Sequence, residues 1–246
     1  MKILIILLFA ANAQARVFNF QNEHFAPYFR GSIGLSTLGD SAYGGASGTS
    51  TKFSETPDYN YTGEAGFLFT TARIGFTFGV EFLTSSKLST EGNTSSGTKL
   101  MDLDSKVSGT ILKGGILWHY KVGTMYRAYI ALNGGLADLK MKNNSELTAA
   151  GTTAYSLTTV DEVAVAQSVL AEMLFGFEFN LADVTTMIVE GGYRSLKVDK
   201  WEYDGSGTNF LGAYTDGGTV LNHDGTKRQS NLSGWLLAIG FRFYIN

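Results

Sequence analysis

Apolar and polar residues alternate along several stretches of this chain. From Phe25 to Ser36 the odd positions are mostly apolar, and most of the even positions are polar or small. Successive side chains of a β-strand point to opposite faces, so a period of two predicts a strand with one apolar face. The same alternation predicts further strands over residues 65–69, 76–82, 126–136, 163–179, 187–193 and 235–243.

A stretch before residue 118 interrupts the alternation. Leu112, Ile116 and Trp118 share one parity, whereas Val107 and Ile111 have the other. A β-bulge adds one residue to a strand and shifts the parity of everything after it. We therefore expect a strand here with a bulge near Thr110.

The segments between these strands alternate in length. Short turns are expected at 70–75, 121–125 and 180–185, and long segments rich in Ser, Thr, Asn and Gly at 37–61, 84–104, 140–161 and 198–231. Short turns on one rim and long loops on the other are typical of outer-membrane barrels, whose long loops face outside. The pattern predicts an all-β fold, a transmembrane antiparallel up-and-down β-barrel of about eight strands. Ten strands remain open, if Trp201 to Tyr214 forms an extra hairpin.

The two faces of these strands decide which side meets lipid. A soluble lipocalin-like barrel would pack the apolar face inward, but the interior of an eight-stranded barrel is too small for so many aromatic rings. The apolar face is therefore expected to point outward. Aromatic residues also gather near the short turns, which predicts an inner interfacial girdle. Its expected members are Phe25, Tyr28, Phe69, Trp118, Tyr120, Tyr126, Phe177, Phe179, Phe243 and Tyr244, and Phe82, Tyr193 and Trp235 are candidates for a thinner outer girdle.

Composition supports one domain in this class. The chain has 246 residues, 2 of them Pro, and no low-complexity tract or charge block divides it. Mean hydropathy is +0.02, and no apolar run after residue 15 is long enough for a membrane helix. The net charge of −3 and the pI near 5.6 give no basic surface for nucleic acid.

The first residues predict export. Met1 to Ala15 contains a basic residue, an apolar run from Ile3 to Ala11 and a small-x-small cleavage site, so we expect a signal peptide at 1–15 and a mature barrel domain at 16–246 that starts at Arg16. The sequence holds no cysteine, which excludes disulfides, thiolate metal sites and lipid attachment at a cysteine.

The final strand, Trp235 to Asn246 (WLLAIGFRFYIN), together with the alternation of short turns and long loops, resembles the small OmpA/OmpX-type outer-membrane barrels. Here Phe243 is followed by three more residues, whereas the last strand of that family usually ends on an aromatic that the barrel-assembly machinery reads. The resemblance implies a Gram-negative outer-membrane location, contact with outer-membrane lipids and lipopolysaccharide, insertion by that machinery, and a plugged or very narrow lumen.

Eight charged residues lie on the strand faces opposite the apolar ones, and these faces would line the narrow lumen that the resemblance implies. They are Arg30, Glu64, Glu81, Lys113, Glu172, Glu190, Arg194 and Arg242. Charges in a narrow space must be paired or hydrated, so we expect a network. Two cross-strand pairs are expected, Glu172 with Arg194 and Glu190 with Arg242.

Signals for catalysis or metal binding are weak. The chain has three histidines, His24, His119 and His223. His119 is expected at the membrane interface, and His223 with Asp224 and Ser230 is a trio that loops rich in these residues produce by chance. Asp102-Leu103-Asp104 and Asp204-Gly205-Ser206-Gly207 offer too few ligands for a calcium loop. We expect no enzyme, no metal and no cofactor.

The sequence thus predicts a monomeric barrel with a structural or surface-interaction role through its long loops, with an unknown extracellular ligand. A narrow small-solute channel and a lipid-modifying outer-membrane enzyme are the alternatives.

Overall fold

The computed structural model describes residues 18–36, 38, 49–51, 58–222 and 224–245. The expected signal peptide, its cleavage site and the start of the mature chain lie outside these residues, as does most of the first long loop.

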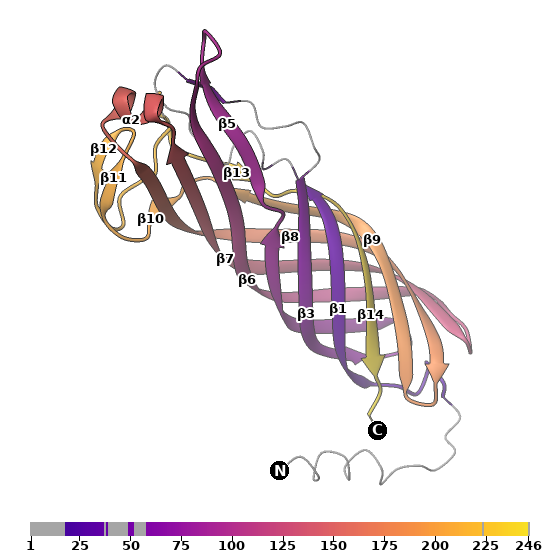
Figure 1. Cartoon of the computed structure of the whole chain (residues 1–246). Coiled ribbons are helices and arrows are strands. Elements are labelled where there is room, and N and C mark those ends of the chain that lie inside the picture. Colours follow the sequence, from indigo (N-terminus) through magenta and orange to yellow (C-terminus); the bar gives the residue numbers. More distant parts are fainter. Residues whose placement is uncertain (1–17, 37, 39–48, 52–57, 223, 246) are drawn as a thin grey trace, which may run out of the picture.

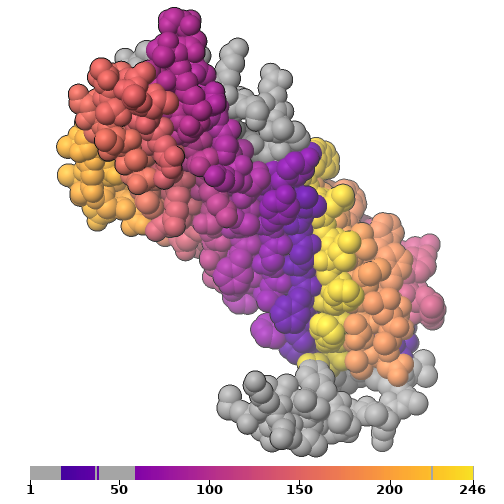
Figure 2. All heavy atoms as spheres, viewed as in Figure 1, coloured from indigo at the N-terminus to yellow at the C-terminus, as the bar shows by residue number. Residues whose placement is uncertain are grey.

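Eight antiparallel strands form a closed ring in which every strand pairs with its two neighbours (Figure 1). In ring order they are β1 (Phe25–Ser36), β3 (Asp58–Thr70), β4 (Ile74–Ser85), β6 (Lys99–Val122), β7 (Tyr126–Leu147), β8 (Thr159–Ala182), β9 (Thr185–Val198) and β14 (Gly234–Phe243). The ring closes where β14 pairs with β1, from Tyr28 opposite Arg242 to Gly34 opposite Leu236. The yellow and indigo surfaces of these two strands lie side by side in Figure 2. The fold class is therefore the one that the alternation predicts.

The three short turns lie at 71–73, 123–125 and 183–184, all at the same end of the barrel. The first strand begins and the last strand ends at this end too. An even number of strands requires that arrangement, since each strand reverses the chain direction.

Two of the expected long loops, 84–104 and 140–161, contain extensions of the ring strands. β6 has 24 residues, β7 has 22 and β8 has 24, so each spans roughly 70 to 80 Å at 3.3 Å per residue. Their outer parts pair with one another far above the rest of the barrel, and β5 (Leu88–Thr94) pairs with β6, while β2 (Thr49–Thr51) pairs with β5. Helix α2 (Ala149–Tyr155) lies in the connection between β7 and β8. Thr148 is its N-cap residue, and its hydroxyl accepts a hydrogen bond from the Gly151 N–H.

The last long segment crosses this projecting part. It contains β10 (Glu202–Tyr203), which pairs with β8, the hairpin β11 (Gly207–Asn209) and β12 (Gly212–Tyr214), and β13 (Ser230–Asn231), which pairs with β9. A hairpin, which the sequence leaves open within 201–214, forms as a separate sheet outside the ring. The ring therefore has eight strands, not ten. We name the projecting parts of β6, β7 and β8, with β5, α2 and the crossing residues 199–222 and 224–232, the outer head.

The expected bulge near Thr110 is absent. β6 pairs with β4 and β7 in unbroken register through Thr110, and its register shift lies between His119 and Lys121 instead. Val107 and Ile111 are fully buried because they point inward, with the parity of Lys113. The apolar face of β6 therefore changes sides at this level without a break in the strand.

Large apolar side chains cover the outside of the lower barrel. On β14 the outward residues Trp235, Leu237 and Ile239 are 67%, 66% and 58% exposed. On β8 the outward apolar band runs from Phe179 to Val169, roughly 33 Å of strand at 3.3 Å per residue, which a tilt near 40° reduces to a height of about 25 Å. That is the height of the apolar band on transmembrane barrels. Separately, none of the helices in the described part of the chain is long and apolar enough to span a membrane.

Candidate functional site: a filled barrel interior

The eight predicted lumen residues all point into the barrel, where each is at most 7% exposed. They come from seven of the eight ring strands, β1, β3, β4, β6, β8, β9 and β14. The parity of each strand places them there, because their sequence neighbours carry the outward apolar face. The closed ring then brings together charges that lie more than 150 residues apart in the sequence.

One half of this polar network is built around Glu172. Arg194 lies directly opposite it on the neighbouring strand and donates to its Oε1 from Nη2 at 2.5 Å. Arg194 also lies 2.6 Å from Glu81, and the ammonium of Lys113 reaches Glu81 at 2.6 Å and Glu172 at 3.1 Å. The pair expected between Glu172 and Arg194 is thus present, within a larger cluster.

The other half is built around Arg30. Its guanidinium donates to Glu190 at 2.5 Å and to Glu64. Tyr28 donates its hydroxyl proton to Glu64, and Tyr129 donates to the second oxygen of Glu190 at 2.7 Å. Glu64 and Glu190 therefore each have two donors, which is the condition for holding charge in a dry interior.

Arg242 does not pair with Glu190 as expected. Glu190 lies opposite Ala238 on β14, and Arg242 lies four residues further along that strand, a separation of about 13 Å. The guanidinium of Arg242 instead donates to Glu178 at 2.5 Å. In the direction of Glu190 it contacts the Tyr129 hydroxyl, at 3.3 Å.

Glu178 is the centre of a second cluster, here named the basal cluster, which the sequence did not predict. Its carboxylate accepts from Arg127 Nε at 2.6 Å, from Arg242, from the Tyr244 hydroxyl at 2.8 Å and from the Thr186 hydroxyl at 2.5 Å. Glu178 and Arg127 are both 0% exposed. Parity could have found Glu178, because it lies between two residues assigned to the lipid face, Phe177 and Phe179.

The interior charges balance. The polar network and the basal cluster together hold five carboxylates and five cations, namely Glu64, Glu81, Glu172, Glu178 and Glu190 with Arg30, Lys113, Arg127, Arg194 and Arg242. A neutral set avoids the cost of an uncompensated buried charge.

The end of the barrel near the short turns is closed by aromatic side chains. Phe20 is fully buried and lies under the guanidinium of Arg127, 4.9 Å from its ring centre. Phe18 packs edge-on against Phe20 and against Tyr244. Tyr28 and Tyr244, expected in the interfacial girdle, are 4% and 2% exposed inside the barrel, because their hydroxyls bind interior carboxylates.

A small cavity lies between the polar network and the basal cluster. It has a volume of about 20 Å³ and lies between Arg30, Glu64, Glu190 and Arg242. A water needs about 10 to 15 Å³ by this measure, so the cavity has room for about one.

The interior of the outer head is mostly apolar, with a buried ion pair between Glu162 and Arg228 at 2.9 Å. Trp201 is fully buried there and donates its indole N–H to the Ser230 hydroxyl at 3.0 Å. Around it lies an apolar core made of Leu38, Leu83, Leu88, Val107, Ile111, Ala137, Leu139, Met141, Ala164, Ala166, Leu170, Leu196, Val198, Tyr203, Val220 and Leu232. The lumen is thus filled by aromatic rings at the base, by ion pairs in the middle and by an apolar core above.

The structure describes only some of the residues considered for catalysis. Ser230 is buried and bound to Trp201, while His223 lies outside the described residues. His119 is buried inside the barrel, edge-on to Tyr129, rather than at the membrane interface. His24 lies 3.1 Å from the Thr70 carbonyl. Within the described ranges, no group of three or more His, Asp or Glu side chains could hold a metal ion.

Comparison with known proteins gives structural matches only. No family model and no curated protein matches the chain. Among solved structures, the attachment invasion locus protein Ail of Yersinia pestis is 12% identical with a TM-score of 0.39, over 90% of this chain and 99% of that one. The outer membrane protein OprG of Pseudomonas aeruginosa is 12% identical with a TM-score of 0.42, over 93% and 100%. Outer Membrane Protein W of Escherichia coli is 15% identical with a TM-score of 0.35, over 90% and 100%.

The last two of these structures are outer-membrane proteins by name. At such scores the fold assignment rests on the strand pairing of this chain, which defines a closed transmembrane β-barrel with a filled interior.

Proposed function

We propose that this protein is a sealed β-barrel of a Gram-negative outer membrane, which displays the outer head outside the cell to contact a surface partner. The filled interior carries this proposal: ion pairs, aromatic rings and an apolar core occupy the lumen. The barrel then serves as an anchor, and the part available for recognition is the head.

The same observation argues against a small-solute channel. A permeating solute would have to displace buried ion pairs of 2.5 to 2.6 Å between Arg30 and Glu190 and between Lys113 and Glu81. A lipid-modifying enzyme has no support from a described catalytic group, since Ser230 is engaged by Trp201. The protein is proposed to be a monomeric non-enzyme, exported with residues 1–15 as a cleaved signal, inserted by the barrel-assembly machinery and surrounded by outer-membrane lipids, including lipopolysaccharide.

Conductance tests the sealed barrel. The purified protein, refolded and inserted into planar bilayers, should give no single-channel steps in neutral salt solution. Regular steps in the unmodified protein would contradict the proposal and favour the channel.

Cysteine labelling tests the orientation. Because the chain has no cysteine, a membrane-impermeant maleimide should label Thr208→Cys, which lies exposed in β11, on intact cells. The matched control Asp183→Cys, exposed in a short turn, should be labelled only after lysis. The reverse result would place the head in the periplasm.

A further inference from the structure

The outward face of the outer head carries its charges in two rows. β5, β6 and β7 lie side by side there (Figure 1), and each contributes a lysine and an acid that are four residues apart on the outward face. All six residues are exposed. They are Lys87 and Glu91 at β5, Asp102 and Lys106 on β6, and Lys142 and Glu146 on β7.

Strand register places the three acids in one row, the acid row. Asp102 lies directly opposite Glu91 on one side and Glu146 on the other. Like charges directly opposite each other destabilise a strand pair. Lys99 contacts Glu91 and Asp102, each at 2.7 Å. Three acids and one lysine leave the acid row with two uncompensated negative charges.

The lysines form a second row, the lysine row. Lys106 lies directly opposite Lys142, and the register of β5 with β6 places Lys87, which directly precedes β5, at the same level. Lys87 is paired with Asp104 at 2.7 Å. Within the described ranges, Lys106 and Lys142 form no ion pair. The lysine row therefore has two uncompensated positive charges.

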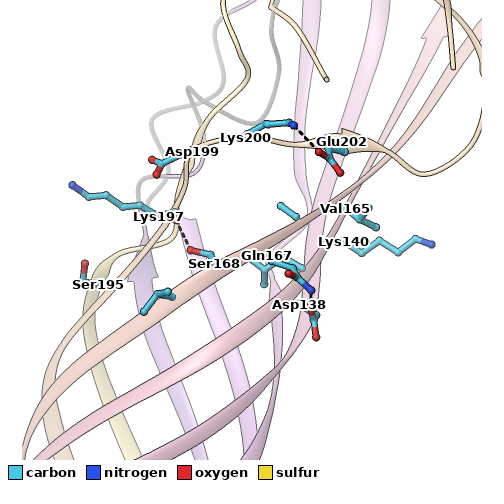
Figure 3. Close-up of a pocket in the computed structure, with 13 residues that line it drawn as sticks. Asp138, Lys140, Val165, Gln167, Ser168, Ser195, Lys197, Asp199, Lys200 and Glu202 are labelled. Carbon is cyan, nitrogen blue, oxygen red and sulfur yellow. Dashed lines mark hydrogen bonds and ion pairs between the residues drawn. The ribbon is translucent and has the colours of Figure 1, made fainter. Parts of the chain in front are cut away.

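The two rows cannot neutralise each other within one chain. Four residues of strand separate them, a distance of about 13 Å. Lys140, two residues before Lys142, extends away from the wall of the head, beside the opening between β8 and the crossing segment (Figure 3), and it is already paired with Asp204 at 2.7 Å. A surface that neutralises both rows must carry two such rows in the reverse order.

A second copy of this chain carries such a surface. Asp104 and Asn144 lie opposite each other midway between the rows. A twofold axis across the strands at this level makes two heads antiparallel and brings Lys106 to Asp102 of the second copy, and Lys142 to Glu146 of the second copy. Each contact then occurs twice, as in any isologous interface.

We propose that the outer head binds the outer head of a second copy on a facing membrane, with the acid row of each copy against the lysine row of the other. Two copies in the same membrane would be parallel, so that rows of equal sign would meet and repel. This inference rests on the proposed function, because it names the surface partner of the head.

The height of the head fits this arrangement. Asn144 lies eight residues above Leu136, the last residue of the lipid-facing band on β7, which is about 26 Å of strand and about 20 Å of height at a tilt near 40°. Two hydrocarbon boundaries would then be about 40 Å apart. β6 ends at Lys99, five residues beyond Asp104, so the strands of one head end above the membrane of the other.

Each contact is expected to be weak, because exposed ion pairs contribute little. A membrane that displays many copies multiplies the contacts, and avidity then exceeds the affinity of one pair. Aggregation of membranes is therefore the appropriate measurement.

Vesicle aggregation tests the proposal. The full-length protein is refolded in phosphatidylcholine vesicles, and impermeant maleimide on Thr208→Cys verifies that heads lie outside. These vesicles should aggregate, and the aggregated fraction should fall at least tenfold when the Debye length is reduced from about 30 Å to about 3 Å by salt. Vesicles with labelled heads that stay dispersed at low salt would overturn this inference and leave the orientation of the proposed barrel intact.

Exchanging the two rows gives the sharpest comparison. The variant Asp102→Lys, Glu146→Lys, Lys106→Glu and Lys142→Glu keeps the net charge and should aggregate with itself. Mixed with wild-type vesicles of another colour, it should form at least tenfold fewer mixed contacts than contacts of its own kind. Equal mixing would mean that general charge attraction holds the vesicles, and would overturn the proposal.

Two smaller variants serve if the fourfold variant does not refold by gel-shift assay. Lys106→Glu with Lys142→Glu, and Asp102→Lys with Glu146→Lys, should each stay dispersed alone and aggregate when mixed. A mixture that stays dispersed would contradict the pairing of the rows.

Net charge and lipid binding have their own controls. Lys197→Glu with Lys227→Glu changes the net charge as much as the lysine-row variant does, but outside the rows, and should leave aggregation unchanged. Loss of aggregation in this control would overturn the assignment. Protein-free phosphatidylglycerol vesicles should not be captured by wild-type vesicles, and their capture through Lys106 and Lys142 would mean that the lysine row binds lipid phosphate instead of a second head.

Discussion

The two levels of the barrel interior have opposite chemistry within one continuous wall. In the lower barrel the inward residues of β8 include Glu178 and Glu172, and the outward ones are apolar. Above Leu170 the inward residues Ala166 and Ala164 belong to an apolar core, and outward residues such as Gln167 are polar. Below this boundary the outside is lipid, so polar groups gather inside. Above it the outside is water, so apolar groups do.

The two regions should respond differently when they are disrupted. An ion-pair network loses stability when one partner leaves a buried charge behind, whereas an apolar core loses it in proportion to the cavity created.

Removing the centre of the basal cluster should have the largest effect. Glu178→Ala leaves Arg127 and Arg242 without their shared carboxylate in a buried site. We expect a loss of about 3 to 5 kcal/mol, measured as a shift of the urea unfolding midpoint in lipid vesicles. The control Glu202→Ala breaks an exposed pair with Lys200 and should cost at most about 1 kcal/mol. Equal losses in the two variants would contradict a dry interior.

Trp201→Ala should disrupt the apolar core alone. The side chain is fully buried, and large-to-small changes of this kind cost about 3 kcal/mol or more. The loss should be confined to the head: protease should cut the segment after β9 sooner, while heat-resistant mobility of the barrel on gels stays normal. Loss of that mobility would mean that the two regions fold as one unit.

The outward face of the barrel should tolerate an added charge only above the boundary between lipid and water. Ile239→Arg places a cation on an outward position that is 58% exposed in β14, and near the midplane it should cost about 2 to 4 kcal/mol. The control Gln167→Arg, outward but above the band, should change stability by less than about 0.5 kcal/mol. Refolding titrations in vesicles measure both. Similar costs would refute the position of the boundary.

The same boundary explains what the sequence could predict. Alternation, short turns and an outward aromatic face were sufficient for the barrel, and parity alone placed residues such as Glu172 and Arg194 inside. At Val107 and Ile111 the apolar face changes sides because the surroundings change from lipid to water. The prediction of a bulge at Thr110 assumed that the whole strand lies in one environment, so it attributed this change to an extra residue in the strand.

Pairing was harder to predict than position. Glu190 and Arg242 both point into the barrel but lie at different levels of their strands. The alternation of apolar and polar residues shows which face a side chain is on, but not which residue of the next strand it lies opposite. The strand structure of 84–104 and 140–161 was also missed, because polar outward residues such as Asp102 and Asn144 conceal a strand whose other face is buried.

The smallest expected effect is a loosening of the head at alkaline pH. Burial, and then the charge of Glu162, raise the pKa of Tyr203 above its usual value of 10.0. Tyr203 lies in the head, where its hydroxyl accepts from the Asn209 amide at 2.8 Å. A phenol whose pKa is raised by folding resists ionisation in the native state. Its contribution to the stability of the head is therefore complete below pH 10 and is lost as the pH rises through the native pKa.

Protease susceptibility of the head should increase above pH 10 and return to normal on neutralisation. Tyr203→Phe should weaken this dependence, whereas Tyr120→Phe, in the exposed inner girdle, should retain it; an unchanged profile in the Tyr203 variant would show that another group controls the alkaline response.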